Sequence, residues 1–313
     1  MEKKIATREA YGKALLEFGK DERIIVLDAD LSKSTKTDLF KKEYPDRFFD
    51  MGIAEANMMS YAAGLAACGK VVFASTFAIF AAGRAYEQIR NSIAYPNLNV
   101  KIGASHAGIS VGEDGASHQA IEDIALMTAI PNITVLSPCD EVETRCAVRA
   151  AIEHDGPVYI RLGRLGVPKI FDEDNYEFKL GKGIQVRDGS DVTIISTGLM
   201  TNYAIEASEM LAKQNISARV VNMHTLKPID KDIIIKAACE TKAIVTAEEH
   251  NVIGGLGSLV ASVTAQNCPV PIKMVGVLDK FGKSGKPNEL LVKYGLTEYD
   301  IENKVKEVLK LKR

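Results

Sequence analysis

The order of short apolar runs and longer helix-like segments constrains the fold of this chain most strongly. Runs of four or five apolar or β-branched residues recur at 24–27, 71–74, 100–104, 133–136 and 158–162. Segments with helical spacing of apolar residues separate them, for example 55–68 and 142–154. Continuous apolar strands that alternate with helices are typical of a parallel sheet covered by helices on both faces. We therefore expect an α/β fold.

A polar stretch divides this pattern into two parts. Residues 166–185 contain Pro168, an acidic run and a G-K-G sequence, and they fit neither strand nor helix spacing. The alternation resumes at 192–196 and continues to a final helix near the end of the chain. We expect two domains, each a mostly parallel sheet flanked by helices, at residues 1–165 and 186–313, with 166–185 as the linker.

Charge and cysteine usage exclude several classes of protein. The 313 residues contain 39 Lys plus Arg and 41 Asp plus Glu, and no block of like charge stands out. This balance does not favour binding to nucleic acid or to a membrane surface, and no apolar run is long enough to span a bilayer. The five scattered cysteines form no C-x-x-C pair, which favours reduced thiols over disulfides or a zinc site. The first residues lack the apolar core of a signal peptide. We expect a cytoplasmic protein.

One carboxylate opens a helix that is apolar on every face. Glu55 lies in D-M-G-I-A-E-A-N-M-M, and the residues that follow it are mostly Ala and Met as far as Cys68. A helix that is apolar all round is buried in a core or in a subunit interface. Two interpretations remain from the pattern alone. Glu55 is a helix-capping acid, or it is a buried acid that exchanges a proton with a ligand.

Other polar and aromatic side chains follow the predicted strands, where parallel sheets bind ligands. Phe77 and Phe80 are three residues apart, so a planar ligand could stack on them, although two core phenylalanines would show the same spacing. His106, Asp114 and His118 lie in a glycine-rich loop after 100–104. The 12-residue gap between the histidines is no standard metal spacing. Acid–base chemistry or recognition of hydroxyl groups fits better than a metal, and a solvated loop is the alternative.

Two arginines are candidates for binding an anion. Arg8 lies in A-T-R-E-A, and Arg164 follows the predicted strand at 158–162. A pair of guanidinium groups can hold a phosphate, whereas each arginine by itself is as easily a surface salt-bridge partner.

In their order along the chain, these segments resemble the transketolase family. The matching sequences are A-T-R-E, A-D-L-S-K-S, M-G-I-A-E-A-N, S-T-F-A-I-F and V-G-E-D-G-A-S-H-Q-A-I-E. In the second half they are S-T-G at 196–198, L-K-P-I-D at 226–230 and G-G-L-G-S at 254–258. The resemblance implies that residues 1–165 form a pyrimidine-binding domain of a thiamine-diphosphate enzyme and that 186–313 form the transketolase C-terminal domain.

The resemblance also implies roles for individual residues. Glu55 would bond the aminopyrimidine ring of thiamine diphosphate, Phe77 and Phe80 would form the aromatic pocket around it, and Asp30 would lie near the cofactor. His106 and His118 would act with Glu55 in catalysis. The groups expected to contact the sugar phosphate are Arg8, Ser34, His106, Asp114, His118 and Arg164.

Two departures from the family pattern affect these expectations. A family aromatic three residues after Phe80 falls at Gly83, which leaves one wall of the pocket to Tyr86 or to a partner residue. The diphosphate-binding domain, with its G-D-G motif, is missing from the chain. The resemblance therefore implies that this chain has no metal ligands, that Mg²⁺ and the diphosphate are held by an N-terminal subunit, and that the two chains form an α2β2 heterotetramer.

The activity implied is transfer of a two-carbon ketol unit from a ketose phosphate to an aldose phosphate, in pentose phosphate metabolism or in a specialised sugar-phosphate route. A β-subunit of a 2-oxo-acid dehydrogenase has the same two domains, but its loop reads more like G-x-G-x-Q-H-S-Q than G-E-D-G-A-S-H-Q. Deoxyxylulose-phosphate synthase shares the loop but carries all its domains on one chain. A non-catalytic regulatory subunit of the same fold is a further alternative. Loss of Glu55 or of the pair His106 and His118 would indicate such a subunit, but all three residues are present.

Overall fold

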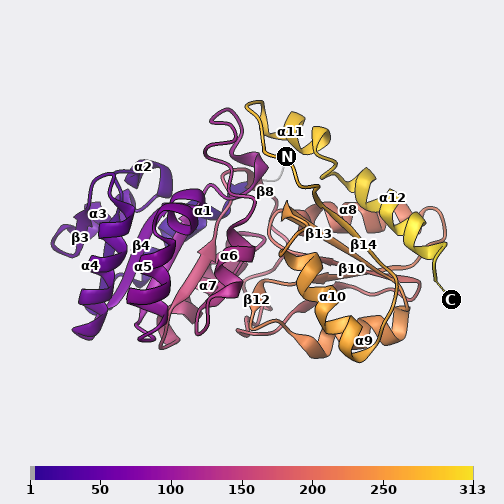
Figure 1. Cartoon of the computed structure of the whole chain (residues 1–313), viewed down its shortest axis with the longest axis horizontal. Helices are drawn as coiled ribbons and strands as arrows, with labels where there is room; N and C mark the ends of the chain where they lie inside the picture. Colours follow the sequence, from indigo (N-terminus) through magenta and orange to yellow (C-terminus); the bar gives the residue numbers. More distant parts are fainter. Residues whose placement is uncertain (1–3, 313) are drawn as a thin grey trace.

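The computed structural model describes residues 4–312, and its two sheets lie side by side (Figure 1). The larger sheet has the strand order β12-β6-β7-β5-β4-β2-β3. Its strands are β2 (Ile24–Asp28), β3 (Phe48–Asp50), β4 (Val71–Phe77), β5 (Val100–Ser105), β6 (Thr134–Leu136), β7 (Val158–Arg161) and β12 (Thr225–Lys227). All neighbours pair in parallel except β12 with β6. The expected α/β fold is confirmed.

The smaller sheet has the strand order β14-β13-β10-β11-β9. Its strands are β9 (Ile184–Arg187), β10 (Val192–Ser196), β11 (Ala218–Asn222), β13 (Ile244–Asn251) and β14 (Ile272–Val277), and β9 alone among them runs antiparallel to its neighbour. A short antiparallel ribbon pairs β1 (Ile5–Ala6) with β8 (Gly166–Val167). The polar stretch expected as a linker therefore carries a short strand at its beginning and the start of another at its end.

Helices cover both sheets (Figure 1). The helices of the N-terminal half are α1 (Thr7–Phe18), α2 (Ser32–Thr35), α3 (Asp38–Glu43), α4 (Glu55–Ala67), α5 (Tyr86–Gln88), α6 (Asp123–Ala129) and α7 (Glu141–Glu153). Those of the C-terminal half are α8 (Met200–Ala212), α9 (Lys231–Thr241), α10 (Leu256–Asn267), α11 (Pro287–Lys293) and α12 (Glu298–Leu309). Across residues 4–312, none of these helices combines the length and the apolar character needed to cross a membrane.

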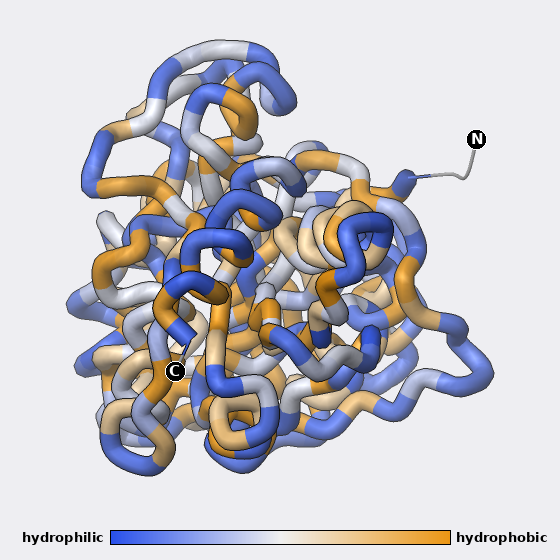
Figure 2. The backbone as a smooth tube through the Cα atoms, turned by 90° about the vertical axis from the view of Figure 1, so that its right-hand side faces the viewer, coloured by the Kyte–Doolittle hydropathy of each residue, from blue (hydrophilic) through white to orange (hydrophobic). Residues whose placement is uncertain are grey.

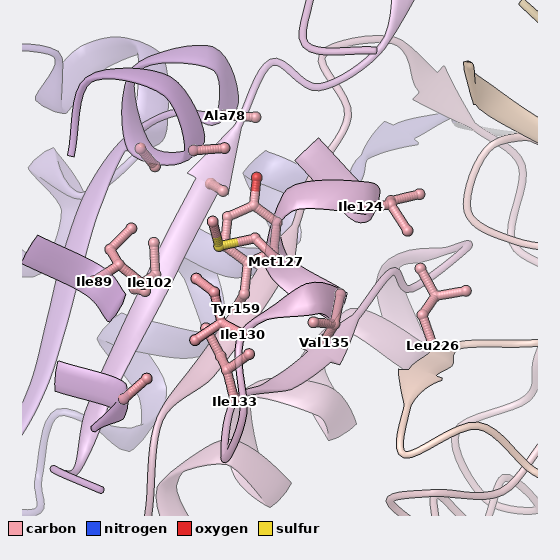
Figure 3. Close-up of a cluster of buried hydrophobic side chains, with 14 of the residues drawn as sticks. Ala78, Ile89, Ile102, Ile124, Met127, Ile130, Ile133, Val135, Tyr159 and Leu226 are labelled. Atoms are coloured by element: carbon pink, nitrogen blue, oxygen red, sulfur yellow. The ribbon is translucent and has the colours of Figure 1, made fainter. Parts of the chain in front are cut away.

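The core around the larger sheet is made of apolar side chains from its strands and from the helices that cover it. Ile102 of β5, Tyr159 of β7 and Met127 of α6 are among the buried side chains in Figure 3. Burying one such side chain stabilises the fold by about 1.5–3 kcal/mol. The hydroxyl of Tyr159 donates a hydrogen bond to Asp123 Oδ2 at 3.0 Å, so its polar end is satisfied inside the core. Hydrophobic and hydrophilic segments alternate along the whole backbone (Figure 2), as expected for two layered domains.

The two sheets are joined by direct contacts. Strand β12, from the C-terminal half, forms the edge of the larger sheet by pairing with β6, and its residue Leu226 is buried. The buried Arg161 pairs with Asp123 at 2.9 Å and also donates a hydrogen bond to the backbone oxygen of Glu249 at 2.9 Å. The pairing of β12 with β6 and the hydrogen bond from Arg161 to Glu249 therefore join the two halves, and Asp123 holds Arg161 in place for that bond.

Candidate active site

Parallel pairing brings the segments singled out in the sequence to one edge of the larger sheet. Phe77 at the end of β4 is in register with Ser105 at the end of β5. The ends of β2 and β3 are also in register, through Asp28 and Asp50. Because the carboxyl ends of parallel strands meet at the same edge, the residues that follow these strands lie together.

Four of the predicted residues form an aromatic cluster, by which we mean Phe77, Phe80, His106 and His118. The Phe77 ring stacks on the His106 ring with a centroid distance of 3.9 Å, and it lies 5.8 Å from the Phe80 ring with an interplanar angle of 12°. His118 approaches edge-on, 5.3 Å from Phe80 and 6.2 Å from Phe77. The structure therefore brings together residues that are up to 41 positions apart in the sequence.

Glu55 lies at the first position of α4, and only 4% of its side chain is exposed. The unpaired N–H groups at the start of a helix favour a negative charge there. Its carboxylate accepts hydrogen bonds from Arg84 Nη1, at 3.2 Å to Oε1 and 3.5 Å to Oε2. The side chain of Arg84 is 54% exposed, so the partner of this buried carboxylate comes from the surface.

Arg84 is the residue of this site that the sequence reasoning missed. Its guanidinium carbon lies 4.0 Å from the centroid of the Phe80 ring, within the range of a cation–π contact. The segment from Phe80 to Arg84 is a π-helix, in which Gly83 directly precedes Arg84. A side chain at Gly83 would meet nothing within 4 Å. The one signal in the sequence is the missing family aromatic at Gly83, from which Tyr86 or a partner residue was expected to form that wall of the pocket, and not Arg84.

His106 is buried, and its hydrogen bonds assign its tautomer. Arg8 Nη1 lies 3.3 Å from His106 Nε2, and Ser105 Oγ lies 2.9 Å from Nδ1. Arginine can only donate, so Nε2 is the acceptor and the proton of the neutral ring is on Nδ1. Burial lowers the pKa of His106 to about 3, and the positive charges of Arg8 and Arg164 act in the same direction.

We expect the His106 ring to remain neutral from pH 5 to 8. Its folded-state pKa is below the unfolded value of about 6.5, so its contribution to folding stability is complete above pH 6.5 and is lost as the pH falls toward 3. A pH titration of ¹⁵N-labelled histidine side chains, with His106 assigned by the His106→Gln variant, checks this. A midpoint near 6.5 for His106 would contradict the expectation.

The two predicted anion-binding arginines differ in their hydrogen-bond partners, and Arg8 contacts the aromatic cluster directly through His106. Arg8 Nη1 donates to the backbone oxygen of Ser34 at 2.8 Å, while its buried Nε has no partner among the described residues. Burial lowers the pKa of Arg8, and the positive charge of Arg164 adds to the effect. Arg164 donates to the backbone oxygen of Val111 and pairs with Glu113 at 3.0 Å. Two cations this close, one with a free buried donor, can bind an anion.

The remaining predicted residues do not join the cluster directly. Asp30 is exposed in a left-handed backbone conformation with φ of 60°, and its N–H donates to Asp50 Oδ1 at 3.1 Å. Asp114 is exposed in the glycine-rich loop. Within residues 4–312, neither carboxylate has a hydrogen bond to the cluster, and Ser34 contributes its backbone oxygen only. Their roles stay predictions.

No group of three or more His, Cys, Asp or Glu side chains suited to a metal ion occurs within the described part of the chain. All five cysteines are free thiols.

Comparison with known proteins gives two family matches and several similar chains. Residues 3–169 match the transketolase pyrimidine-binding domain, and residues 181–301 match the transketolase C-terminal domain. A protein of Methanocaldococcus jannaschii, assigned by its name to a transketolase C-terminal section, is 51% identical over 97% of this chain and 96% of its own length. The 6-deoxy-6-sulfo-D-fructose transketolase subunit SqwH of Clostridium sp. is 45% identical over 97% of this chain and 95% of its own length. A split-gene transketolase solved as an inactive beta4 tetramer is 58% identical, covers 99% of this chain and 100% of its own, and has a TM-score of 0.93.

Proposed function

The chain belongs to the transketolase family, which uses thiamine diphosphate, and we propose that it is the subunit of a split transketolase that binds the pyrimidine ring of the cofactor. The observation that carries the proposal is the position of the buried Glu55 carboxylate, which Arg84 links to the aromatic cluster.

The residues at this edge fit a flat, nitrogen-containing ring. Phe80 offers an aromatic surface, and Glu55 offers a buried acceptor whose partner Arg84 is half exposed. The space beside Gly83 is open. A buried carboxylate whose hydrogen-bond partner is a half-exposed side chain can exchange that partner for a ligand.

When bound, thiamine diphosphate supplies the electron sink for breaking a carbon–carbon bond next to a carbonyl group. Within this chain, we propose that Glu55 holds and exchanges a proton with the pyrimidine ring and that Phe77 and Phe80 position the ring. His106 and His118 would hydrogen-bond the oxygen atoms of the donor sugar. Imidazole nitrogens suit that task, because they can donate or accept a hydrogen bond, and His106 would exchange Arg8 or Ser105 for the sugar oxygen.

The anionic end of the sugar would bind at Arg8 and Arg164. The free Nε of Arg8 supports this assignment, since an oxygen of a phosphate would supply its missing partner. Ser34 and Asp114 would contact the same sugar, and Asp30 would lie near the cofactor.

We propose transfer of a two-carbon ketol unit from a ketose phosphate to an aldose phosphate, in the pentose phosphate pathway. The sulfofructose transketolase relative makes a ketose with a sulfonate end the second candidate donor, because arginines bind both anions.

A partner subunit would complete the site. The sequence lacks a G-D-G motif, so we propose that the Mg²⁺ ligands and the grip on the diphosphate lie on an N-terminal transketolase subunit in an α2β2 complex in the cytoplasm. The similar split-gene transketolase was solved as an inactive beta4 tetramer, which supports a requirement for the second chain.

The test is reconstitution. We expect the chain, purified together with a diphosphate-binding transketolase subunit, to convert xylulose 5-phosphate and ribose 5-phosphate in the presence of thiamine diphosphate and Mg²⁺, and the chain alone to be inactive. Transfer by the chain alone would overturn the partner requirement. Decarboxylation of pyruvate by the pair would favour a 2-oxo-acid dehydrogenase subunit, and binding of the partner without turnover would favour a regulatory subunit.

A further inference from the structure

The glycine-rich loop that carries His118 rests on the C-terminal domain. This loop, residues 108–119, leaves β5, passes through a single 3-10 turn at Ile109–Val111 and leads into α6. Three of its glycines have positive φ, between 77° and 89°. Such a loop has little regular structure of its own, so its shape depends on what it packs against. In Figure 1 the connection between β5 and α6 lies beside α11 of the C-terminal half.

The first contact is at the beginning of the loop. The buried side chain of Glu249, on β13, accepts a hydrogen bond from the backbone N–H of Ser110 at 2.5 Å through its Oε1 atom. Gly108, with φ of 85°, lies so close to this carboxylate that a side chain there would overlap it. Burial raises the pKa of Glu249. A buried carboxyl with one short hydrogen bond fixes this end of the loop.

The second contact is at the end of the loop, next to His118. Gln119 is buried, and its Nε2 donates to the backbone oxygen of Ile109 at 3.0 Å and to that of Lys283 at 3.0 Å. Its amide therefore ties the two ends of the loop to each other and to the segment after β14. A side chain at Gly282 would overlap Gln119 Oε1. Gly282 does not have a positive φ, so close approach to Gln119 is the reason for a glycine there.

The middle of the loop touches the same segment. A Cβ atom added at Gly112 would lie 3.0 Å from Pro287 Cγ, and one added at Gly115 would lie 2.5 Å from Ser284 Oγ. Glycines therefore occur where the loop backbone meets residues 282–287. The beginning, middle and end of the loop each contact the C-terminal domain.

We propose that the C-terminal domain is a positioning element of the active site, in which Glu249 and the segment at residues 282–287 hold the glycine-rich loop in the conformation that presents His118 and Asp114 to the sugar. This deepens the proposed function, because the loop matters for turnover only if His118 and Asp114 contact the donor. The domain acts through the loop and touches neither cofactor nor substrate in this proposal.

Gly282→Ala tests the proposal, because the added methyl group displaces the Gln119 side chain. In the chain alone, we expect amide hydrogens of residues 108–119 to exchange several-fold faster by mass spectrometry, while strands β4 and β5 keep their protection. In the reconstituted complex, we expect kcat/KM for the donor to fall roughly tenfold or more, mainly through KM, since a small misplacement of a binding group costs up to about 10²-fold.

Two further variants make the result specific. Gln119→Ala removes the amide that ties the loop to the backbone of Lys283 without adding bulk at residue 282, and we expect the exchange of residues 108–119 and the donor KM to rise as in Gly282→Ala. Lys283→Ala alters an exposed side chain but keeps the backbone oxygen that binds Gln119, and we expect native exchange and native KM.

If amide hydrogen exchange of residues 108–119 is unchanged in Gly282→Ala, the proposal is overturned, regardless of the kinetics of the reconstituted complex. Faster exchange with no change in KM would also overturn it, because the loop would then not serve the site. If no reconstituted complex turns over, the proposed function fails, and the exchange data still decide whether the domain holds the loop.

Discussion

Replacing Glu55 with Gln is expected to lower the turnover of the reconstituted complex by roughly 10²- to 10⁴-fold, the usual contribution of a positioned proton-transfer group. The side chain is 4% exposed at the start of α4, so no water or neighbouring carboxylate can take its place easily. Glutamine keeps the size of the side chain and can still accept a hydrogen bond from Arg84, but it cannot exchange a proton. The measurement is steady-state kcat with saturating thiamine diphosphate and donor.

Glu43→Gln is the matched control, because it removes the same charge from an exposed residue of α3 and should leave kcat unchanged. Size-exclusion chromatography should show that Glu55→Gln assembles with the partner as the native chain does. Native turnover in an assembled Glu55→Gln complex would refute the role of Glu55. A failure to assemble would instead place Glu55 in the interface, as its helix also suggests.

The sequence was most informative where function depends on strand ends. The apolar runs of the sequence analysis predicted β2, β4, β5, β6, β7 and β10 to within a few residues, because continuous β-branched runs favour strands and parallel sheets need apolar residues on both faces. The short strands β3, β9 and β12 were not predicted. Once strands are placed, the carboxyl-end rule brings Phe77, Phe80, His106 and His118 to one edge. The structure confirms that these four residues form one cluster.

Features that depend on contacts between distant segments could not be predicted. Nothing in the local pattern of residues 225–227 reveals that β12, which lies in the C-terminal half of the chain, joins the larger sheet by pairing with β6, since an isolated strand does not specify its partner. The position of Arg84 over Phe80 depends on a π-helix, which has no clear sequence signal. The contact of Gln119 with Lys283 spans 164 residues.

Arg8→Ala is expected to raise the KM for a phosphorylated ketose donor by roughly 10- to 100-fold, because a hydrogen bond to a charged group contributes about 1.5–3 kcal/mol. The reason for choosing Arg8 over Arg164 lies in their partners. Arg164 already pairs with Glu113 at 3.0 Å, whereas the buried Nε of Arg8 has no partner among the described residues. An incoming phosphate therefore gains more from Arg8.

Comparing a phosphorylated donor with its unphosphorylated counterpart separates the effect of Arg8 on phosphate binding from its other effects. Arg8 also donates to His106 Nε2 at 3.3 Å, so its loss could disturb the histidine as well as the phosphate. Xylulose lacks the phosphate, and its KM should change much less than that of xylulose 5-phosphate in Arg8→Ala. Arg149→Ala, which removes an exposed cation of α7, should leave both values unchanged. An equal rise for both donors would show that Arg8 serves to orient His106, and the anion site would then have to be sought around Arg164.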